Sequence, residues 1–167
     1  VSRFGFNPSA MPKSLSLALG SLSIRPLDLA AGYSIFANGG YAVKPHFIES
    51  ISNAAGKVIY KSNLPTACVS ASCSNSVIHD QDEHTKQSGA SHVIQSQNAY
   101  VMTQALKGVI QNGTGRGAKV LGRHDLADKT GTTNKQADAW FAGFNSRVVT
   151  VVWVGFDNLK SLHANFF

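Results

Sequence analysis

The residues best suited to chemistry lie in one short stretch, Lys129-Thr130-Gly131-Thr132-Thr133. In a strand, Thr130 and Thr132 would present two hydroxyls on the same face, because strand side chains alternate. Lys129 adds a fixed positive charge, and Gly131 has no Cβ, so a second backbone can approach closely. A strand edge with this equipment predicts binding of an extended peptide that ends in a carboxylate. On its own, Lys-Thr-Gly is a common triplet, and a lysine with two threonines is also ordinary strand surface.

The sequence of the last third of the chain predicts three strands, which would position the stretch 129–133. They span residues 126–133, 137–144 and 148–156, and Asn145-Ser146-Arg147 would form a tight hairpin between the last two. Trp140, Phe141, Phe144 and Trp153 make these strands apolar along much of their length. We therefore expect an antiparallel meander with helices over at least one face.

Two helices are predicted upstream. One begins at Pro26, where the missing N–H costs nothing, and ends at residues 38–40. The other follows Ser96, which we interpret as its N-cap, and ends at residues 112–113. Between them we expect strands at residues 47–52 and 57–60 around a turn at 53–56. The fold class predicted is α+β, an antiparallel β-sheet covered by helices.

The glycine-rich stretch at residues 113–117 does not predict a dinucleotide site. A Rossmann loop needs a strand before its glycines and a helix after them, and here a helix precedes them. We expect no cofactor and no metal.

Composition argues against nucleic-acid binding. The chain has 167 residues, a net charge of +6 and 43% hydrophobic residues. Its basic residues are scattered and form no run with interleaved aromatics, so we interpret them as a solvated basic surface.

Two further features lie in a polar stretch at residues 62–95, which predicts an insertion or mobile loop. Cys68 and Cys73 are close enough in sequence to predict a disulfide in an oxidising compartment. A zinc site with His79 and His84 is the less favoured alternative, because the spacing is too short for a classical finger.

Taken in order, several blocks resemble the penicillin-binding proteins, class A in particular. Lys129-Thr130-Gly131 resembles the third motif of these proteins and of the serine β-lactamases. The other matching blocks, all in family order, are residues 3–6, 17–21, 33–40, 113–116, 138–144 and 153–157. One departure is Asp128, which stands where many relatives have glycine.

The resemblance implies that residues 1–167 are the C-terminal portion of one transpeptidase domain, incomplete at both ends. The family's nucleophile is the serine of Ser-x-x-Lys, and no lysine here has a serine three positions before it. Ser96-Gln97-Asn98 spells the second motif, Ser-x-Asn, but at the wrong place in the order. We therefore expect a missing N-terminal half to carry both motifs, so that this fragment is inactive alone.

The implied activity is that of a peptidoglycan D,D-transpeptidase, which cross-links stem peptides through a serine acyl-enzyme and is acylated by β-lactams. Lys129 and Thr132 would be catalytic, and Thr130, Gly131 and Thr132 would bind substrate. The implied location is the extracytoplasmic or periplasmic face of the bacterial inner membrane, through an anchor outside this chain. A D,D-carboxypeptidase, a β-lactamase and a non-catalytic cell-wall-binding module remain as alternatives.

Overall fold

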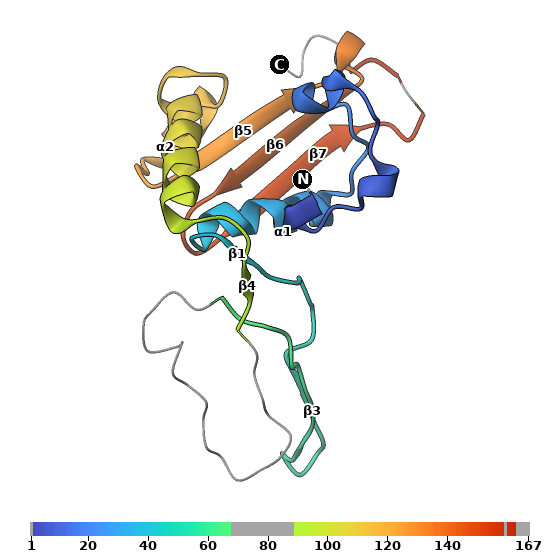
Figure 1. Cartoon of the computed structure of the whole chain (residues 1–167), viewed down its shortest axis with the longest axis vertical. Coiled ribbons are helices and arrows are strands. Elements are labelled where there is room, and N and C mark those ends of the chain that lie inside the picture. The colour runs from blue at the N-terminus through green and yellow to red at the C-terminus, as the bar shows by residue number, and fades with distance from the viewer. Residues whose placement is uncertain (1, 68–88, 159, 163–167) are drawn as a thin grey trace.

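The computed structural model describes residues 2–67, 89–158 and 160–162. Its centre is a three-stranded antiparallel sheet of β5 (Ala127–Thr132), β6 (Asp138–Phe144) and β7 (Val149–Gly155). Figure 1 shows these strands side by side, with helix α2 (Ser96–Asn112) next to β5. The meander and the α+β class predicted from the sequence are confirmed.

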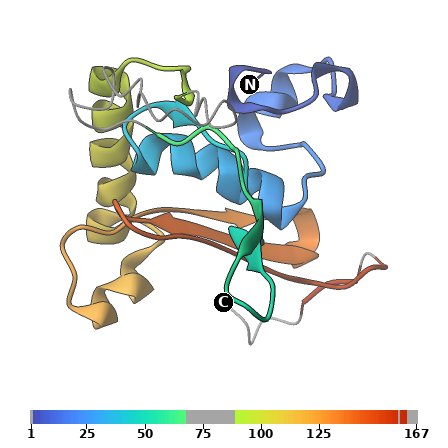
Figure 2. The same ribbon diagram turned by 90° about the horizontal axis from the view of Figure 1, so that it is seen from below.

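Helix α1 (Pro26–Ala37) covers one face of this sheet, as Figure 2 shows. Tyr33 and Phe36 of α1 contact Phe144 of β6, with ring centroids 6.0 and 6.5 Å apart. Leu106 of α2 and Ala127 of β5 complete this core. The core therefore lies between α1, α2 and the near face of the sheet.

The hairpin between β6 and β7 forms as predicted. The Asn145 N–H donates to the carbonyl of Val148, and Asn145 Oδ1 accepts from the backbone N–H groups of Arg147 and Val148. This asparagine side chain satisfies two loop donors, so it fixes the register of the two strands.

A second hairpin, β2 (Ser50–Ser52) and β3 (Val58–Lys61), extends away from the main sheet (Figure 1). It overlaps both predicted strand regions, although β3 ends one residue later than predicted, at Lys61. Asn53 organises its turn by accepting from the backbone N–H groups of Ala55 and Lys57. A third small sheet pairs β1 (Tyr41–Ala42) with β4 (Ser91–His92). β4 was not predicted from the sequence, because its two residues are polar and stand within the polar stretch 62–95.

Short 3₁₀ turns complete the described chain at Ser2–Phe4, Pro8–Ala10, Leu15–Leu19, Arg116–Leu121 and Asn134–Gln136. We label the fourth of these η4. It follows α2 and lies on the side of the sheet away from α1 (Figure 2).

One capping prediction is wrong. The N-cap of α2 is Gln95 and Ser96 is the first helical residue. The Ser96 hydroxyl instead donates to the carbonyl of Gly39 at 3.0 Å. Ser96 therefore ties the start of α2 to the end of α1, an interaction between segments far apart in sequence.

Candidate functional site

Strand β5 has one edge that no other described strand covers. It pairs with β6 alone, and the Thr133 N–H donates to the Asp138 carbonyl at 3.3 Å. Hydrogen-bonded and non-hydrogen-bonded pairs alternate along an antiparallel ladder. The backbone groups of Asp128, Thr130 and Thr132 therefore point away from β6, toward the free edge.

The side chains of the Lys-Thr-Gly stretch flank this edge from two sides. Lys129 pairs with Ala142 and shares the α1 face with Phe144, whereas Thr130 and Thr132 lie on the opposite face. A chain placed along the free edge would meet an ammonium on one side and two hydroxyls on the other. The register of β5 against β6 places Thr130 and Thr132 on one face, as expected from the sequence.

The ammonium of Lys129 already turns toward the edge. Lys129 is exposed, and its Nζ donates to the carbonyl of Thr130 at 2.7 Å. That carbonyl is one of the groups that point away from β6. The positive charge therefore sits beside the backbone that an added strand would use.

Gly131 leaves room on the same face. A Cβ at this position would come 3.2 Å from Cβ of Trp140, which is directly opposite on β6. The Trp140 side chain therefore closes the β6 side of Gly131, whereas the side of Gly131 toward the free edge stays open.

Asp128 is fully buried next to Lys129. Neither of its carboxylate oxygens has a hydrogen-bond partner among the described residues. Burial raises the pKa of Asp128, and the charge of Lys129 opposes part of that rise. The pKa of Tyr33 on α1 is raised as well, first by burial and then by the nearby Asp128 carboxylate. The sequence alone places an acidic residue next to Lys129, but it gives no signal that this residue is buried.

The glycine-rich turn at residues 113–117 lies against the same strand. The hydroxyls of Thr114 and Thr130 are 2.5 Å apart, and a Cβ on Gly115 would collide with the Asp128 carboxylate. Sequence reasoning excluded a dinucleotide loop here, and the helix before the turn agrees with that. It did not find the contact between Thr114 and Thr130, which joins positions 16 residues apart.

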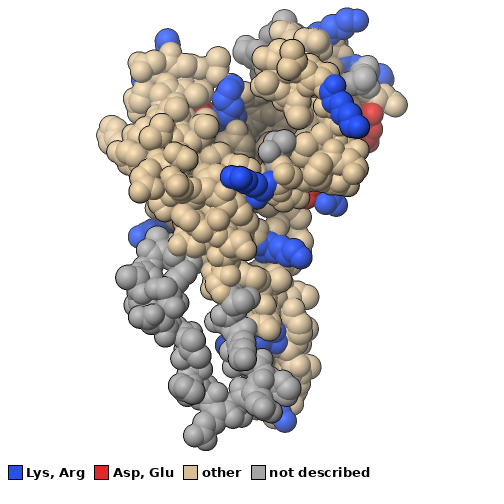
Figure 3. Space-filling model, viewed as in Figure 1, with Lys and Arg blue, Asp and Glu red and all other residues tan. Residues whose placement is uncertain are grey.

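The surface above the sheet is hollowed between α2 and the N-terminal segment. Figure 3 views the molecule from the side on which α1 lies, and Lys and Arg side chains stand around the hollow. Lys129 and Gly131 belong to the face of β5 that lines this side of the sheet. The hollow therefore lies over the face of the sheet that carries Lys129 and Gly131.

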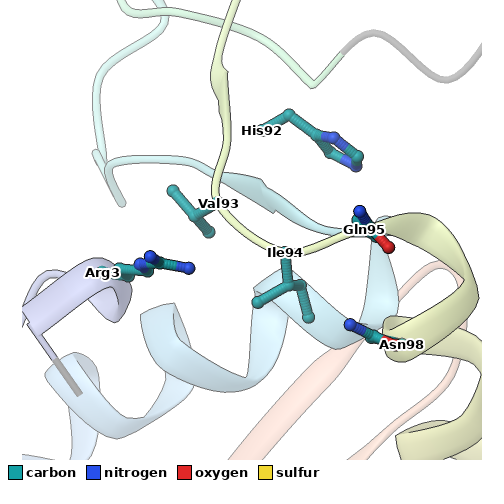
Figure 4. A pocket seen from close by; sticks show the side chains of 6 residues that line it. All are labelled: Arg3, His92, Val93, Ile94, Gln95 and Asn98. Carbon is teal, nitrogen blue, oxygen red and sulfur yellow. The ribbon is translucent and has the colours of Figure 1, made fainter.

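A separate pocket of about 320 Å³ lies near the start of α2 (Figure 4). Its lining comprises Arg3, His92, Val93, Ile94, Gln95 and Asn98. His92 Nε2 is within 3.3 Å of both the Gly39 carbonyl and the Ser96 hydroxyl, so that nitrogen is already engaged. The pocket shares no residue with β5, and its lining holds no carboxylate, thiol or hydroxyl side chain.

The remaining site predictions concern residues outside the described ranges. Cys68, Cys73, His79 and His84 all lie in the undescribed stretch 68–88, so the disulfide and the zinc alternative stay predictions. Among the described residues no cluster of three potential metal ligands is found, and no helix is long and apolar enough to cross a membrane.

Comparison with known proteins gives a consistent result. Residues 4–163 match the family described as the penicillin-binding protein transpeptidase domain. The chain is 39% identical over 188 residues to penicillin-binding protein 1A of Pseudomonas aeruginosa, covering 97% of this chain and 23% of that protein. It is 43% identical over 162 residues to penicillin-binding protein 1A of Neisseria flavescens, covering 97% of this chain and 18% of that protein. The chain thus spans about a fifth of the length of these curated relatives.

Solved structures agree with the sequence relatives. The crystal structure of penicillin-binding protein 1A from Haemophilus influenzae has a TM-score of 0.81 and 34% identity, over 98% of this chain and 27% of that one. The D,D-transpeptidase domain of a peptidoglycan glycosyltransferase from Eggerthella lenta has a TM-score of 0.56 and 26% identity, over 77% of this chain and 26% of that one.

Proposed function

This chain belongs to the penicillin-binding protein transpeptidase family, and from that premise we propose that it forms one wall of the active site of a peptidoglycan D,D-transpeptidase. The observation that carries the proposal is the free edge of β5, flanked by Lys129 on one side and by Thr130 and Thr132 on the other. The substrate is a stem peptide ending in D-Ala-D-Ala, which lies along this edge as an added strand.

The nucleophile comes from the part of the protein that precedes this chain. A serine of Ser-x-x-Lys attacks the carbonyl of the penultimate D-Ala, so that a Ser–acyl bond forms and the peptide bond to the terminal D-Ala breaks. The proton from the serine passes through a base to the departing amine. An amine from a neighbouring stem peptide then takes the acyl group and frees the serine. A β-lactam acylates the same serine and leaves slowly.

Within this scheme the residues of β5 have separate tasks. The N–H of Thr132, which points to the free edge, is one of two donors of an oxyanion hole; the serine's own N–H is the other. The hydroxyls of Thr130 and Thr132 bind the terminal carboxylate of the substrate. Gly131 lets the peptide backbone approach closely.

Lys129 acts through its charge. A cation next to a second ammonium lowers the pKa of that ammonium, because the two positive charges repel. Lys129 thereby helps the lysine of Ser-x-x-Lys to serve as the base at neutral pH.

The whole protein works at the extracytoplasmic or periplasmic face of the inner membrane, held by an anchor outside this chain. Peptidoglycan stem peptides and β-lactams are its ligands. The class A resemblance further implies a glycosyltransferase domain in the same protein. This chain alone is inactive because it carries no Ser-x-x-Lys.

Intact-mass measurement after incubation with a penicillin tests the proposal. The full-length protein should gain the mass of the drug at one serine, whereas the isolated 167-residue chain should gain none. Acylation of the isolated chain, or no acylation of the full-length protein, would contradict the assignment.

A second assay separates the transpeptidase from its close alternatives. With a D-Ala-D-Ala stem peptide and an amine acceptor, a transpeptidase yields the cross-linked product. A D,D-carboxypeptidase yields only the hydrolysed peptide, and a β-lactamase turns over the penicillin rapidly. A cell-wall-binding module would bind the polymer without any of these reactions.

A further inference from the structure

The glycine-rich turn at residues 113–117 has no task in the chemistry described above, yet it contacts two successive side chains on the face of β5 that points away from α1. Thr114 reaches Thr130, and Gly115 lies directly over Asp128. Both contacts are on the face of β5 opposite Lys129. The turn therefore fixes the two residues on either side of Lys129.

Either hydroxyl of the Thr114–Thr130 pair could donate the hydrogen bond, and a bound ligand determines which one does. Each hydroxyl has one proton and can also accept. A carboxylate can only accept, so Thr130 must give its single proton to the substrate when it binds one. In that state the hydrogen bond between the two threonines survives only if Thr114 is the donor.

We propose that Thr114 is a positioning residue, which donates a hydrogen bond to Thr130 Oγ1 and so directs the Thr130 proton toward the carboxylate of the substrate or of a β-lactam. This inference rests on the proposed function, because it needs a carboxylate ligand at Thr130. The hydroxyl pair also holds the Thr130 side chain in one rotamer, so the donor is in place before the ligand arrives.

The neighbouring glycine explains how the turn comes so close. Gly115 is buried at φ −85°, a conformation open to any residue, so backbone freedom is not the reason for glycine here. The reason is space, since a Cβ would collide with the carboxylate of Asp128. Any side chain at this position would push the turn, and Thr114 with it, away from β5.

A double-mutant cycle on the full-length protein tests the role of Thr114. The variants are Thr114→Val, Thr130→Val and both together, and the measurement is the second-order rate of acylation by a fluorescent penicillin. Thr114→Val should lower that rate about tenfold, the effect of one well-placed hydrogen bond. In the Thr130→Val background the same change should have almost no effect, because the proton it directs is gone.

Two controls separate positioning from folding. Thr114→Ser keeps the hydroxyl and should restore most of the rate. Thr103→Val removes a hydroxyl that donates to the Ala99 carbonyl within α2 and makes no hydrogen bond to β5, so it should leave acylation unchanged. Equal losses from Thr114→Val in both backgrounds would overturn the proposal and indicate a structural role, as would a full rate in Thr114→Val.

A second pair of variants keeps the idea testable if Thr114→Val fails to fold. Gly115→Ala should lower acylation by displacing the turn, and adding Asp128→Gly should recover the rate by removing the carboxylate that the new Cβ would meet. No recovery in the double variant would contradict the packing argument. Absence of acylation in the unchanged full-length protein would instead overturn the proposed function itself.

Discussion

Strands β5 and β7 are the two edge strands of one sheet, yet they carry different kinds of residue. β5 reads Ala-Asp-Lys-Thr-Gly-Thr, whereas β7 reads Val-Thr-Val-Val-Trp-Val-Gly. Both present backbone donors and acceptors along a free edge in the part of the chain that the structure describes. β7 also holds one threonine and one glycine, but of the two edge strands only β5 combines a lysine with two threonines that share a face.

The face of β7 away from α1 is open and carries two valines and one threonine, Thr150. Val152 and Val154 are 46% and 44% exposed there. Such a surface suits further apolar packing, and β5 suits reversible binding of a polar chain. An exposed strand edge therefore becomes a candidate site through its side chains and not through its backbone alone. The following experiments test this distinction.

Removal of an outward backbone N–H should have the largest effect. Thr132→Pro deletes the donor assigned to the oxyanion hole and should lower the acylation rate of the full-length protein about 10²–10³-fold. Thr132→Val keeps that N–H and should lose much less. Stopped-flow acylation by a fluorescent penicillin measures both.

Val151→Pro is the matched change on the other edge. Asn145 and Val148 form a hydrogen-bonded pair, so by alternation the N–H of Val151 points away from β6. Proline is tolerated at such edge positions, and acylation should stay within about twofold of the unchanged protein. A comparable loss from Val151→Pro would mean that the two edges do not differ as argued.

Removal of the charge on β5 should have the next largest effect. In Lys129→Gln the repulsion that lowers the pKa of the Ser-x-x-Lys ammonium is lost. That pKa should rise, so the acidic limb of the pH–rate profile moves to higher pH and the rate at neutral pH falls about tenfold.

Lys135 in the turn after β5 provides the control for charge alone. Its side chain is exposed, and Lys135→Gln removes the same charge from the molecule. The pH–rate profile should keep its position in this variant. A shift of equal size in both variants would point to the net charge of the surface and away from a specific role of Lys129.

The two glycines on the edge strands should respond in opposite ways. A Cβ on Gly155 of β7 would come 2.5 Å from the Trp153 ring, so Gly155→Ala should cost about 1–3 kcal/mol of stability through overpacking. A Cβ on Gly131 would come 3.2 Å from Cβ of Trp140, so Gly131→Ala should destabilise the fold less than Gly155→Ala does. Gly131→Ala should lower the acylation rate more, because the added methyl group narrows the approach of the ligand to the edge of β5. Thermal unfolding and acylation rates of the two variants measure the crossover. Parallel losses in both assays would contradict it.

Much of this arrangement follows from local sequence. The strand pattern, the proline at the start of α1 and the asparagine hairpin are short-range signals, and all three are confirmed. β4 and the role of Ser96 depend on contacts across 50 or more residues, such as Ser96 with Gly39, and no local pattern encodes them.

The site divides in the same way. Lys129 and the threonines were predicted as a group because their spacing alone places them on one strand. The contact of Thr114 with Thr130 and the burial of Asp128 arise where the end of α2 meets β5. Burial by a distant segment leaves no periodicity in the sequence, so these two features needed the fold.

The smallest predicted effect is that of Asp128 on the pH dependence of stability. The burial of its carboxyl group determines the sign of this effect. Its pKa is raised in the folded state, so the folded protein binds the proton more tightly than the unfolded chain does. Its favourable contribution to the free energy of unfolding is fully present below the ordinary carboxyl pKa and is lost as pH rises through the raised one. The melting temperature of the full-length protein should therefore decline less with rising pH in Asp128→Asn, which cannot ionise.

Asp125 gives the opposite case on the loop before β5. Its hydrogen bond from Arg123 lowers the pKa of this exposed carboxyl, so its contribution is present above the ordinary pKa and is lost as pH falls. Asp125→Asn should flatten the acidic side of the stability profile and leave the side above the carboxyl range unchanged. If Asp128→Asn instead flattened the acidic side of the stability profile, as Asp125→Asn should, the Asp128 carboxylate would have a hydrogen-bonding or charged partner in solution. The close packing of Gly115 against this carboxylate would then be contradicted.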